Sequence, residues 1–297
     1  MPSAVAIEVE DLHKEYGERE AVRGISFSVE QGEVFGLLGP NGAGKTTTVE
    51  ILEGYRARTR GHVAVLGMDP GPRPAALRER IGIVLQSSGL YRHLTVHEAV
   101  SHWAGFYHAP RDVEETIALT GLDAAAGQRT RTLSGGQQRR LDFALALIGD
   151  PELVFLDEPT TGFDPAARRQ AWDTVRSLRD LGKTVLLTTH YLDEAQALAD
   201  RVAIVKDGAI LAEGAPRDLG SAARRHRVAW RDADGTAHER DTDEPTALLH
   251  EITGRALARG EQLLELSVTR PSLEDVYLEL TAEPAETAET AETAAVT

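Results

Sequence analysis

One eight-residue stretch, Gly39–Thr46, limits the possible folds of this chain more than any other. It matches the phosphate-binding pattern G-x-x-x-x-G-K-[ST] without a mismatch. An apolar run of strand length, residues 33–38, precedes it, and residues 46–53 can continue as a helix. Strand, glycine-rich loop and helix, in this order, form the context in which the pattern binds phosphates. The sequence therefore predicts an α/β fold with a phosphate site at the start of this helix.

The residue types of the loop suit an anion. Gly42 and Gly44 let the backbone come close and aim N–H groups at phosphates, where the helix also presents its positive end. Lys45 is expected to reach the β- and γ-phosphates, and the Thr46 hydroxyl is expected to ligate Mg²⁺. The alternative is a tight glycine turn before an ordinary helix, but the Gly-Lys-Thr sequence and both flanks favour the phosphate site.

Composition excludes several other classes of protein. A length of 297 residues suits one large domain, or one with a small second domain, and the net charge of -15 argues against a nucleic-acid binder. The chain has no cysteine, which excludes disulfides and cysteine-based sites and fits a reducing cytoplasm. The N-terminus does not resemble a signal peptide, and no apolar run is long enough to span a bilayer. Membrane association is therefore expected only through a partner.

Polar or charged residues follow three apolar, strand-like runs: Gln86, the pair Asp157 and Glu158, and His190. In open α/β sheets the carboxyl ends of parallel strands form the ligand-binding edge. Asp157 is the expected second Mg²⁺ partner, and Glu158 is placed to position or deprotonate an attacking water. Gln86 is either a plain loop residue or an amide near the metal and water. A lone histidine such as His190 is more often structural, but its place at the same edge favours function.

Two further motifs have ordinary alternatives. Ser134, followed by Gly135 and Gly136, can present backbone N–H groups at a helix start, which predicts a second anion site. A capped helix alone explains the same residues equally well. Tyr16 ends a predicted strand, where its ring can stack on a nucleotide base or simply pack.

The rest of the chain suggests that a helical insert, a small C-terminal region and a tail accompany the core. Residues 4–10 alternate like an edge strand, and residues 96–119 have helical spacing without strand signals, which predicts a helical insert. Residues 217–281 resemble a small α+β region in which we find no site chemistry. The tail, residues 284–293, repeats Ala-Glu-Thr and is expected to be disordered because it has almost nothing apolar to bury.

Taken together and in order, these motifs resemble the ATP-binding subunit of ABC transporters. The resemblance covers about residues 4–230 and depends on the ordered set, which is far more specific than its members. Gly39–Thr46 is similar to the Walker A loop, and residues 154–158 are similar to the Walker B strand with the catalytic glutamate. The other matches are the Q-loop at Gln86, the signature at Leu133–Gln137, the D-loop at Gly162–Asp164, the H-loop at His190 and the adenine-stacking aromatic at Tyr16.

This resemblance implies a P-loop NTPase core of α/β class with an antiparallel β piece and a helical subdomain. A small α+β C-terminal domain, residues 231–281, and a disordered acidic tail, residues 282–297, are expected to follow. The implied cofactors are ATP and Mg²⁺, with Glu158, His190 and Lys45 as catalytic residues. The implied metal ligands are Thr46, Gln86 and Asp157. The implied nucleotide-binding residues are Tyr16, Gly39, Pro40, Asn41, Gly42, Ala43, Gly44, Lys45, Thr46, Thr47, Gln86, Ser134, Gly135, Gly136, Gln137 and Asp164.

The resemblance also implies partners. Two such domains would pair head to tail, with each ATP between the Walker A loop of one and the signature of the other. A separate membrane permease would hold the pair at the inner face of the cell membrane, and no nucleic acid is expected. Residues 271–277 are similar to the drug- and antibiotic-export branch, typified by daunorubicin-resistance ATPases. The alternatives are an ATPase of the superfamily that is not coupled to transport and an inactive nucleotide-binding scaffold.

Overall fold

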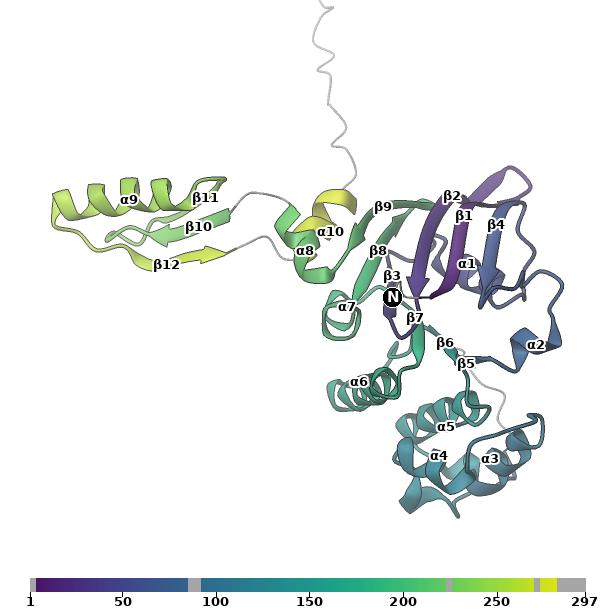
Figure 1. Ribbon diagram of the computed structural model, residues 1–297. Coiled ribbons are helices and arrows are strands. Elements are labelled where there is room, and N and C mark those ends of the chain that lie inside the picture. The colour runs from purple at the N-terminus through teal and green to yellow at the C-terminus, as the bar shows by residue number, and fades with distance from the viewer. Residues whose placement is uncertain (1–3, 85–91, 223–225, 270–272, 282–297) are drawn as a thin grey trace, which may run out of the picture.

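The computed structural model describes residues 4–84, 92–222, 226–269 and 273–281. Within these ranges, a six-stranded sheet forms the centre of the molecule (Figure 1). All its strands are parallel except the last, which is antiparallel to its neighbour. In spatial order they are β5 (Ile81–Val84), β6 (Leu153–Asp157), β7 (Thr184–Thr189), β3 (Val34–Leu38), β8 (Arg201–Lys206) and β9 (Ala209–Gly214). The predicted parallel sheet is confirmed.

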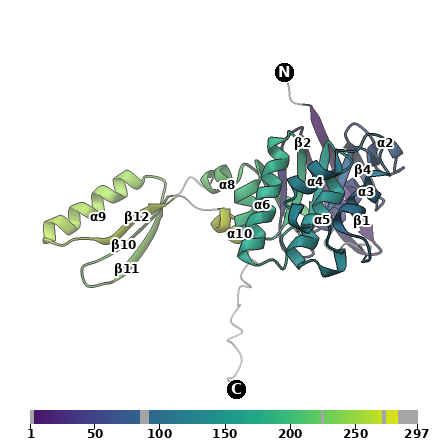
Figure 2. The same cartoon turned by 90° about the horizontal axis from the view of Figure 1, so that it is seen from below.

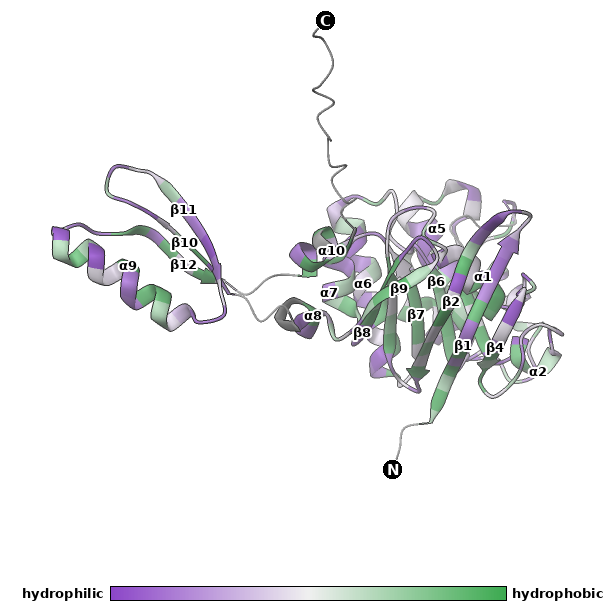
Figure 3. Cartoon of the chain, turned by 90° about the horizontal axis from the view of Figure 1, so that it is seen from above, coloured by the Kyte–Doolittle hydropathy of each residue, from purple (hydrophilic) through white to green (hydrophobic). Residues whose placement is uncertain are grey.

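The central strands are covered on both faces, which explains why β3 and β7 are apolar along their whole length. On one face, Phe35 and Leu37 pack in a cluster with α1 (Lys45–Leu52). On the other face, Val34 packs in a cluster with α5 (Gly135–Leu147) and α6 (Pro165–Asp180). Apolar residues accordingly concentrate on these strands (Figure 3).

A separate antiparallel sheet has the order β2-β1-β4 and shares the cluster around α1. Its strands are β1 (Val5–Tyr16), β2 (Arg19–Glu30) and β4 (Arg60–Val65). The prediction of an edge strand at residues 4–10 is therefore wrong, because β1 pairs with a strand on each side. Alternation of apolar and polar side chains shows that one face is buried, but it carries no information on how many backbone edges are paired.

The predicted helical insert is confirmed at α3 (Val96–Ala104) and α4 (Val113–Leu119), which pack against α5. It follows the short helix α2 (Ala75–Arg78) and strand β5. A capping box at the start of α3 and an aspartate cap on α4 satisfy the first backbone N–H groups of both helices. The insert has its own apolar core, centred on Val100, Ile117 and Leu141.

The chain returns to the central sheet at its C-terminal end. Leu273 begins α10 (Leu273–Thr281) and is buried in a cluster with α7 (Leu192–Leu198), α8 (Pro216–Ala222) and β8. Helix α8 was not expected, although a proline is well suited to the first turn of a helix. None of the helices in the described ranges is long and apolar enough to cross a membrane.

Between α8 and α10, a small unit projects away from the central sheet (Figures 1 and 2). Its antiparallel sheet has the order β11-β10-β12 and is covered by α9 (Pro245–Arg259). The strands are β10 (His226–Arg231), β11 (Ala237–Thr242) and β12 (Leu264–Thr269). Val228, Leu248 and Ile252 form its core.

The expected domain limits need correction. A boundary after residue 230 would cut through β10, whose pairing with β11 and β12 places it in the small unit. At the other end, the apolar side chains of α10, Leu273 among them, pack in a cluster of the central body. The small unit is therefore residues 226–269. The predicted tail, residues 282–297, lies outside the described residues.

Candidate functional site

The predicted meeting of strand ends is confirmed for the described strands. Leu38 is paired with Thr189, and Asp157 with Thr188, so β3, β6 and β7 end at one edge of the sheet. The glycine-rich loop, Glu158 and His190 follow these three ends directly. Adjacent parallel strands thus bring together residues that lie far apart in the sequence.

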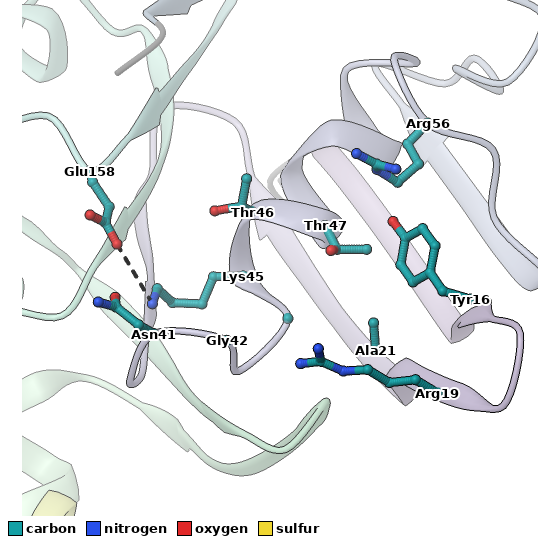
Figure 4. A pocket seen from close by; sticks show the side chains of 11 residues that line it. Tyr16, Arg19, Ala21, Asn41, Gly42, Lys45, Thr46, Thr47, Arg56 and Glu158 are labelled. Carbon is teal, nitrogen blue, oxygen red and sulfur yellow. Dashed lines mark ion pairs between the residues drawn. The ribbon is translucent and has the colours of Figure 1, made fainter. Parts of the chain in front are cut away.

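A pocket of about 460 Å³ lies at this edge (Figure 4). It is shaped by the glycine-rich loop, the first turn of α1, the adjoining ends of β1 and β2, Arg56 and the residue after β6. Its lining residues are Tyr16, Arg19, Ala21, Asn41, Gly42, Gly44, Lys45, Thr46, Thr47, Arg56 and Glu158. The volume is in the range of small-molecule sites.

The loop needs glycine for two physical reasons. Gly42 and Gly44 have φ values of 82° and 102°, where side chains are strained. A Cβ atom on Gly44 would also lie 2.5 Å from the Ala21 carbonyl oxygen, and one on Gly39 would lie 2.1 Å from that of Val205. Because Gly44 is the N-cap and has no side chain, it does not cap the first N–H groups of α1 as a serine would. These groups can bind an anion instead.

Lys45 is buried beneath the loop. Its Nζ donates hydrogen bonds to the carbonyl oxygens of Gly39 at 2.8 Å and Pro40 at 3.1 Å. It also lies 3.9 Å from Glu158 Oε1, the ion pair drawn in Figure 4. Burial lowers the pKa of Lys45, while the carboxylates of Glu158 and Asp157 raise it. The loop carbonyl groups and these carboxylates thus hold the Lys45 ammonium group at the floor of the pocket.

Oxygen ligands for a metal lie beside this lysine. Asp157 Oδ1 accepts hydrogen bonds from the hydroxyls of Thr188 at 2.6 Å and Thr46 at 3.4 Å. Hydroxyl and carboxylate oxygens suit Mg²⁺, which usually has few protein ligands beside phosphates and water. The described residues contain no cluster of three or more His, Asp or Glu side chains that could hold a metal. Thr46 and Asp157 thus place one hydroxyl and one carboxylate oxygen side by side at this edge.

Glu158 has an unusual backbone. Its φ of 46° lies in the left-handed region, which costs about 1–3 kcal/mol for a residue other than glycine. The Glu158 N–H donates to the Thr188 hydroxyl at 3.0 Å, which helps to hold this conformation. Its carboxylate accepts a 3.0 Å hydrogen bond from the Thr161 hydroxyl, and its Oε1 lies 3.4 Å from His190 Nδ1. The strained backbone thus belongs to the residue whose carboxylate faces Lys45.

Several residues near the pocket were not found from the sequence. Arg19 and Arg56 line it, and Arg56 lies 5.4 Å from the centre of the Tyr16 ring. Tyr16 itself is 41% exposed, so it lines the pocket instead of packing in the core. Arginines gave no signal because they are common on surfaces. Thr188 precedes His190 by two residues, and its polarity within a buried strand was the one available signal.

Other predicted residues do not meet in this pocket. Within the described chain, its lining includes none of Ser134–Gln137, which begin α5 in the helical insert (Figure 1). Ser134 and Gln137 form a capping box, as the capped-helix alternative predicted, and Gly135 and Gly136 face open space. Asp164 caps α6 through the N–H groups of residues 166 and 167. Gln86 lies outside the described residues.

A buried carboxyl group lies at the C-terminal end of α1. Glu53 ends α1 and is 8% exposed. Burial first, and then the negative charges of Asp157 and Glu50, raises the pKa of Glu53 from its ordinary 4.5 to about 8. Between these values the unfolded chain releases the proton while the folded chain keeps it. Stability is therefore expected to fall as the pH rises from about 4.5 to about 8.

Replacing Glu53 with glutamine should remove this penalty. Without nucleotide, we expect Glu53→Gln to raise the melting temperature by roughly a few degrees at pH 8.5, with a smaller effect at pH 5. Scanning calorimetry at both pH values measures the difference. Glu115→Gln, on the exposed surface of α4, should give the same small shift at both. An equal shift for Glu53→Gln at both pH values would contradict the raised pKa.

Comparison with known proteins identifies the family. A family model described as ABC transporter matches residues 22–161. The linearmycin resistance ATP-binding protein of Bacillus subtilis is 35% identical to this chain, over 93% of the chain and 98% of that protein. The chain belongs to the ABC transporter family. This ABC ATPase is also 39% identical to the daunorubicin/doxorubicin resistance ATP-binding protein of Streptomyces peucetius, over 94% and 93% of the two chains.

Solved structures agree with this ABC ATPase in fold. An ATP-binding cassette solved as a dimer bound to ADP and Pi matches 70% of the chain and 98% of its own length, with a TM-score of 0.63 and 26% identity. The Nod factor export ATP-binding protein I of Rhizobium sp. (strain N33) is 38% identical, over 94% of this chain and 98% of that protein. The predicted family, fold class and ATPase activity are therefore confirmed, and the chain binds nucleotide.

Proposed function

We propose that this ABC ATPase hydrolyses ATP at sites shared between two copies, and so powers export of a drug or antibiotic through a separate membrane permease. The proposal is based on one observation: the predicted site residues fall on two separate parts of the chain. The pocket contains the glycine-rich loop with Glu158, while Ser134–Gln137 lie on α5 outside its lining. A second copy would supply the missing side.

Within one pocket, the residues divide the chemistry. Tyr16 would stack on the adenine, and the N–H groups at the start of α1 would bind the phosphates. Thr46 and Asp157 would hold Mg²⁺, which neutralises charge on the β- and γ-phosphates when bound. Glu158 would position or deprotonate the attacking water, and Lys45, whose Nζ lies 3.9 Å from Glu158 Oε1, would contribute positive charge toward the γ-phosphate.

His190 would complete this arrangement. With its Nδ1 3.4 Å from Glu158 Oε1, the imidazole can orient the carboxylate and stabilise charge on the transferring phosphoryl group. Phosphoryl transfer has a loose transition state, so positioning and electrostatics supply most of the rate. The ends of β6 and β7 suit this task because they fix the backbone at Asp157, Glu158 and His190.

The transport role is proposed from relatives. Those whose names state a role are called resistance or export ATP-binding proteins. Since this chain has no membrane-spanning helix in its described ranges, a permease would provide the path through the bilayer. An ATPase of the superfamily without a transport partner is the second candidate, and no feature of the described residues favours it.

A reconstitution experiment tests the proposal. The purified chain alone should stay in the supernatant with phosphatidylglycerol vesicles, whereas co-expression with its cognate permease should bring it to the membrane fraction. In proteoliposomes of the complex, ATP should drive daunorubicin transport, and Lys45→Ala should abolish it. Quantitative binding of the chain alone to vesicles would contradict the need for a permease. A complex that hydrolyses ATP without moving any of a panel of antibiotics would contradict the export role.

A further inference from the structure

Glu194 is a buried carboxyl group outside the nucleotide pocket. It lies in α7, four residues after His190, and its side chain has no solvent exposure. One carboxylate oxygen, Oε1, accepts hydrogen bonds from the Thr160 hydroxyl at 2.8 Å and the Trp172 indole N–H at 3.1 Å. Burying a carboxyl group is costly without such partners. These two donors to Oε1 lie in different parts of the chain, Thr160 after β6 and Trp172 in α6.

The first donor, Thr160, lies close in the chain to Glu158. Thr160 is two residues after Glu158, and the hydroxyl of the next residue, Thr161, donates to Glu158 Oε2 at 3.0 Å. Two consecutive threonines therefore donate to two different carboxylates, one to Glu194 and one to Glu158. Because the two threonines are adjacent in the chain, fixing Thr160 also restricts the backbone that directs Thr161.

The same segment is held from a second side. Arg139, buried in α5, donates from Nε to the Pro159 carbonyl oxygen at 3.2 Å. Residues 159–161 are thus fixed between α5, which begins with the signature, and α7, which follows His190. The segment that follows Glu158 is therefore held by two helices, α5, which begins after Ser134, and α7, which begins after His190.

We infer that Glu194 is a positioning residue for ATP hydrolysis, which anchors Thr160 and thereby orients the Glu158 carboxylate through Thr161. The inference rests on the proposed role of Glu158 as the group that acts on water. Glu194 does not line the pocket, so its effect on Glu158 would pass through residues 159–161. Burial raises the pKa of this carboxyl group, against the effect of its hydrogen bonds from Thr189, Thr160 and Trp172. A glutamine, which is neutral and of similar shape, should therefore be tolerated there.

The second donor offers a matched control. Trp172 binds the same carboxylate oxygen from α6, but its bond fixes no residue that lines the pocket. Thr160→Val keeps the shape of the side chain and removes the hydroxyl, whereas Trp172→Phe keeps an aromatic ring and removes the N–H. Both variants take one hydrogen bond from Glu194, so a role in stability alone predicts similar effects.

We expect Thr160→Val to lower kcat about tenfold, with the Kd for ATP within about twofold of the wild type, because small misplacements of a catalytic group are costly. Trp172→Phe should lower the melting temperature and leave kcat unchanged. Glu194→Gln, whose amide oxygen accepts the same bonds, should restore most of the turnover lost in Glu194→Ala. These values come from steady-state ATPase assays, nucleotide titration and thermal unfolding of the purified full chain.

Two results would overturn the inference. One is an unchanged kcat in folded Thr160→Val, and the other is an equal loss of kcat in Thr160→Val and Trp172→Phe. If Glu194→Ala does not fold, Thr160→Val still decides. Glu158→Gln separates this inference from the function on which it rests. If Glu158→Gln is inactive while Thr160→Val is normal, only the positioning role fails, whereas an active Glu158→Gln removes the role of Glu158 itself.

Discussion

Glu158→Gln is expected to lower the ATP turnover number by roughly 10²–10⁴-fold, because the amide cannot accept the proton of the attacking water. Nucleotide affinity should change little. The phosphate loop does not depend on this side chain, since the Lys45 Nζ keeps its hydrogen bonds to Gly39 and Pro40. The ATPase assay measures the loss, and titration with a fluorescent nucleotide checks the affinity.

A control for this variant is a second glutamate that flanks β6. Glu152 precedes β6 at the opposite end from the site and pairs with Arg80 at the surface. Glu152→Gln removes the same charge and should leave kcat near the wild-type value. Turnover of Glu158→Gln within a factor of about three of the wild type would show that another group acts on the water.

Ser134→Arg is expected to abolish ATP hydrolysis while leaving ATP binding by a single chain intact. The residue begins α5, outside the lining of the pocket of its own chain, so an added arginine cannot block that pocket directly. It would instead block the second copy from closing over the nucleotide. In the Glu158→Gln background, ATP should trap a dimer in size-exclusion chromatography, and adding Ser134→Arg should return it to a monomer.

Ala118→Arg is the matched control because it places the same side chain on an exposed position of α4 in the same helical insert. Its ATPase activity should remain at the wild-type level. If Ser134→Arg also hydrolyses ATP normally, each chain contains a complete site and the shared-site proposal is wrong. Activity that rises more than linearly with protein concentration would independently support the pair.

The pocket floor was predictable because its parts carry local signals. Gly42 and Gly44 occupy backbone conformations that favour glycine, and a phosphate loop shows this need in its sequence. Glu158 and His190 follow buried strands, and the order of parallel strands makes their ends meet. These inferences needed no knowledge of distant contacts beyond the general geometry of an α/β sheet.

The missed features depend on long-range packing. Arg19 and Arg56 reach the pocket from the antiparallel sheet side, and no local pattern shows where those arginines point. The central position of β1 also depends on which strands pair, because side-chain alternation is the same in an edge strand and a central one. The link from Glu194 to Thr160 joins residues that lie 34 positions apart.

The return of α10 to the central body has a mechanical consequence. Because Leu273 packs there, the unit of residues 226–269 is an insertion between two helices of the central body, α8 and α10. A unit joined to a body at two points of the chain has fewer orientations open to it than a unit joined at one point. The Arg227–Asp275 ion pair, at 3.1 Å, also links the first strand of the unit directly to α10. A shift of α10 would therefore act on the unit through this ion pair as well as through the chain.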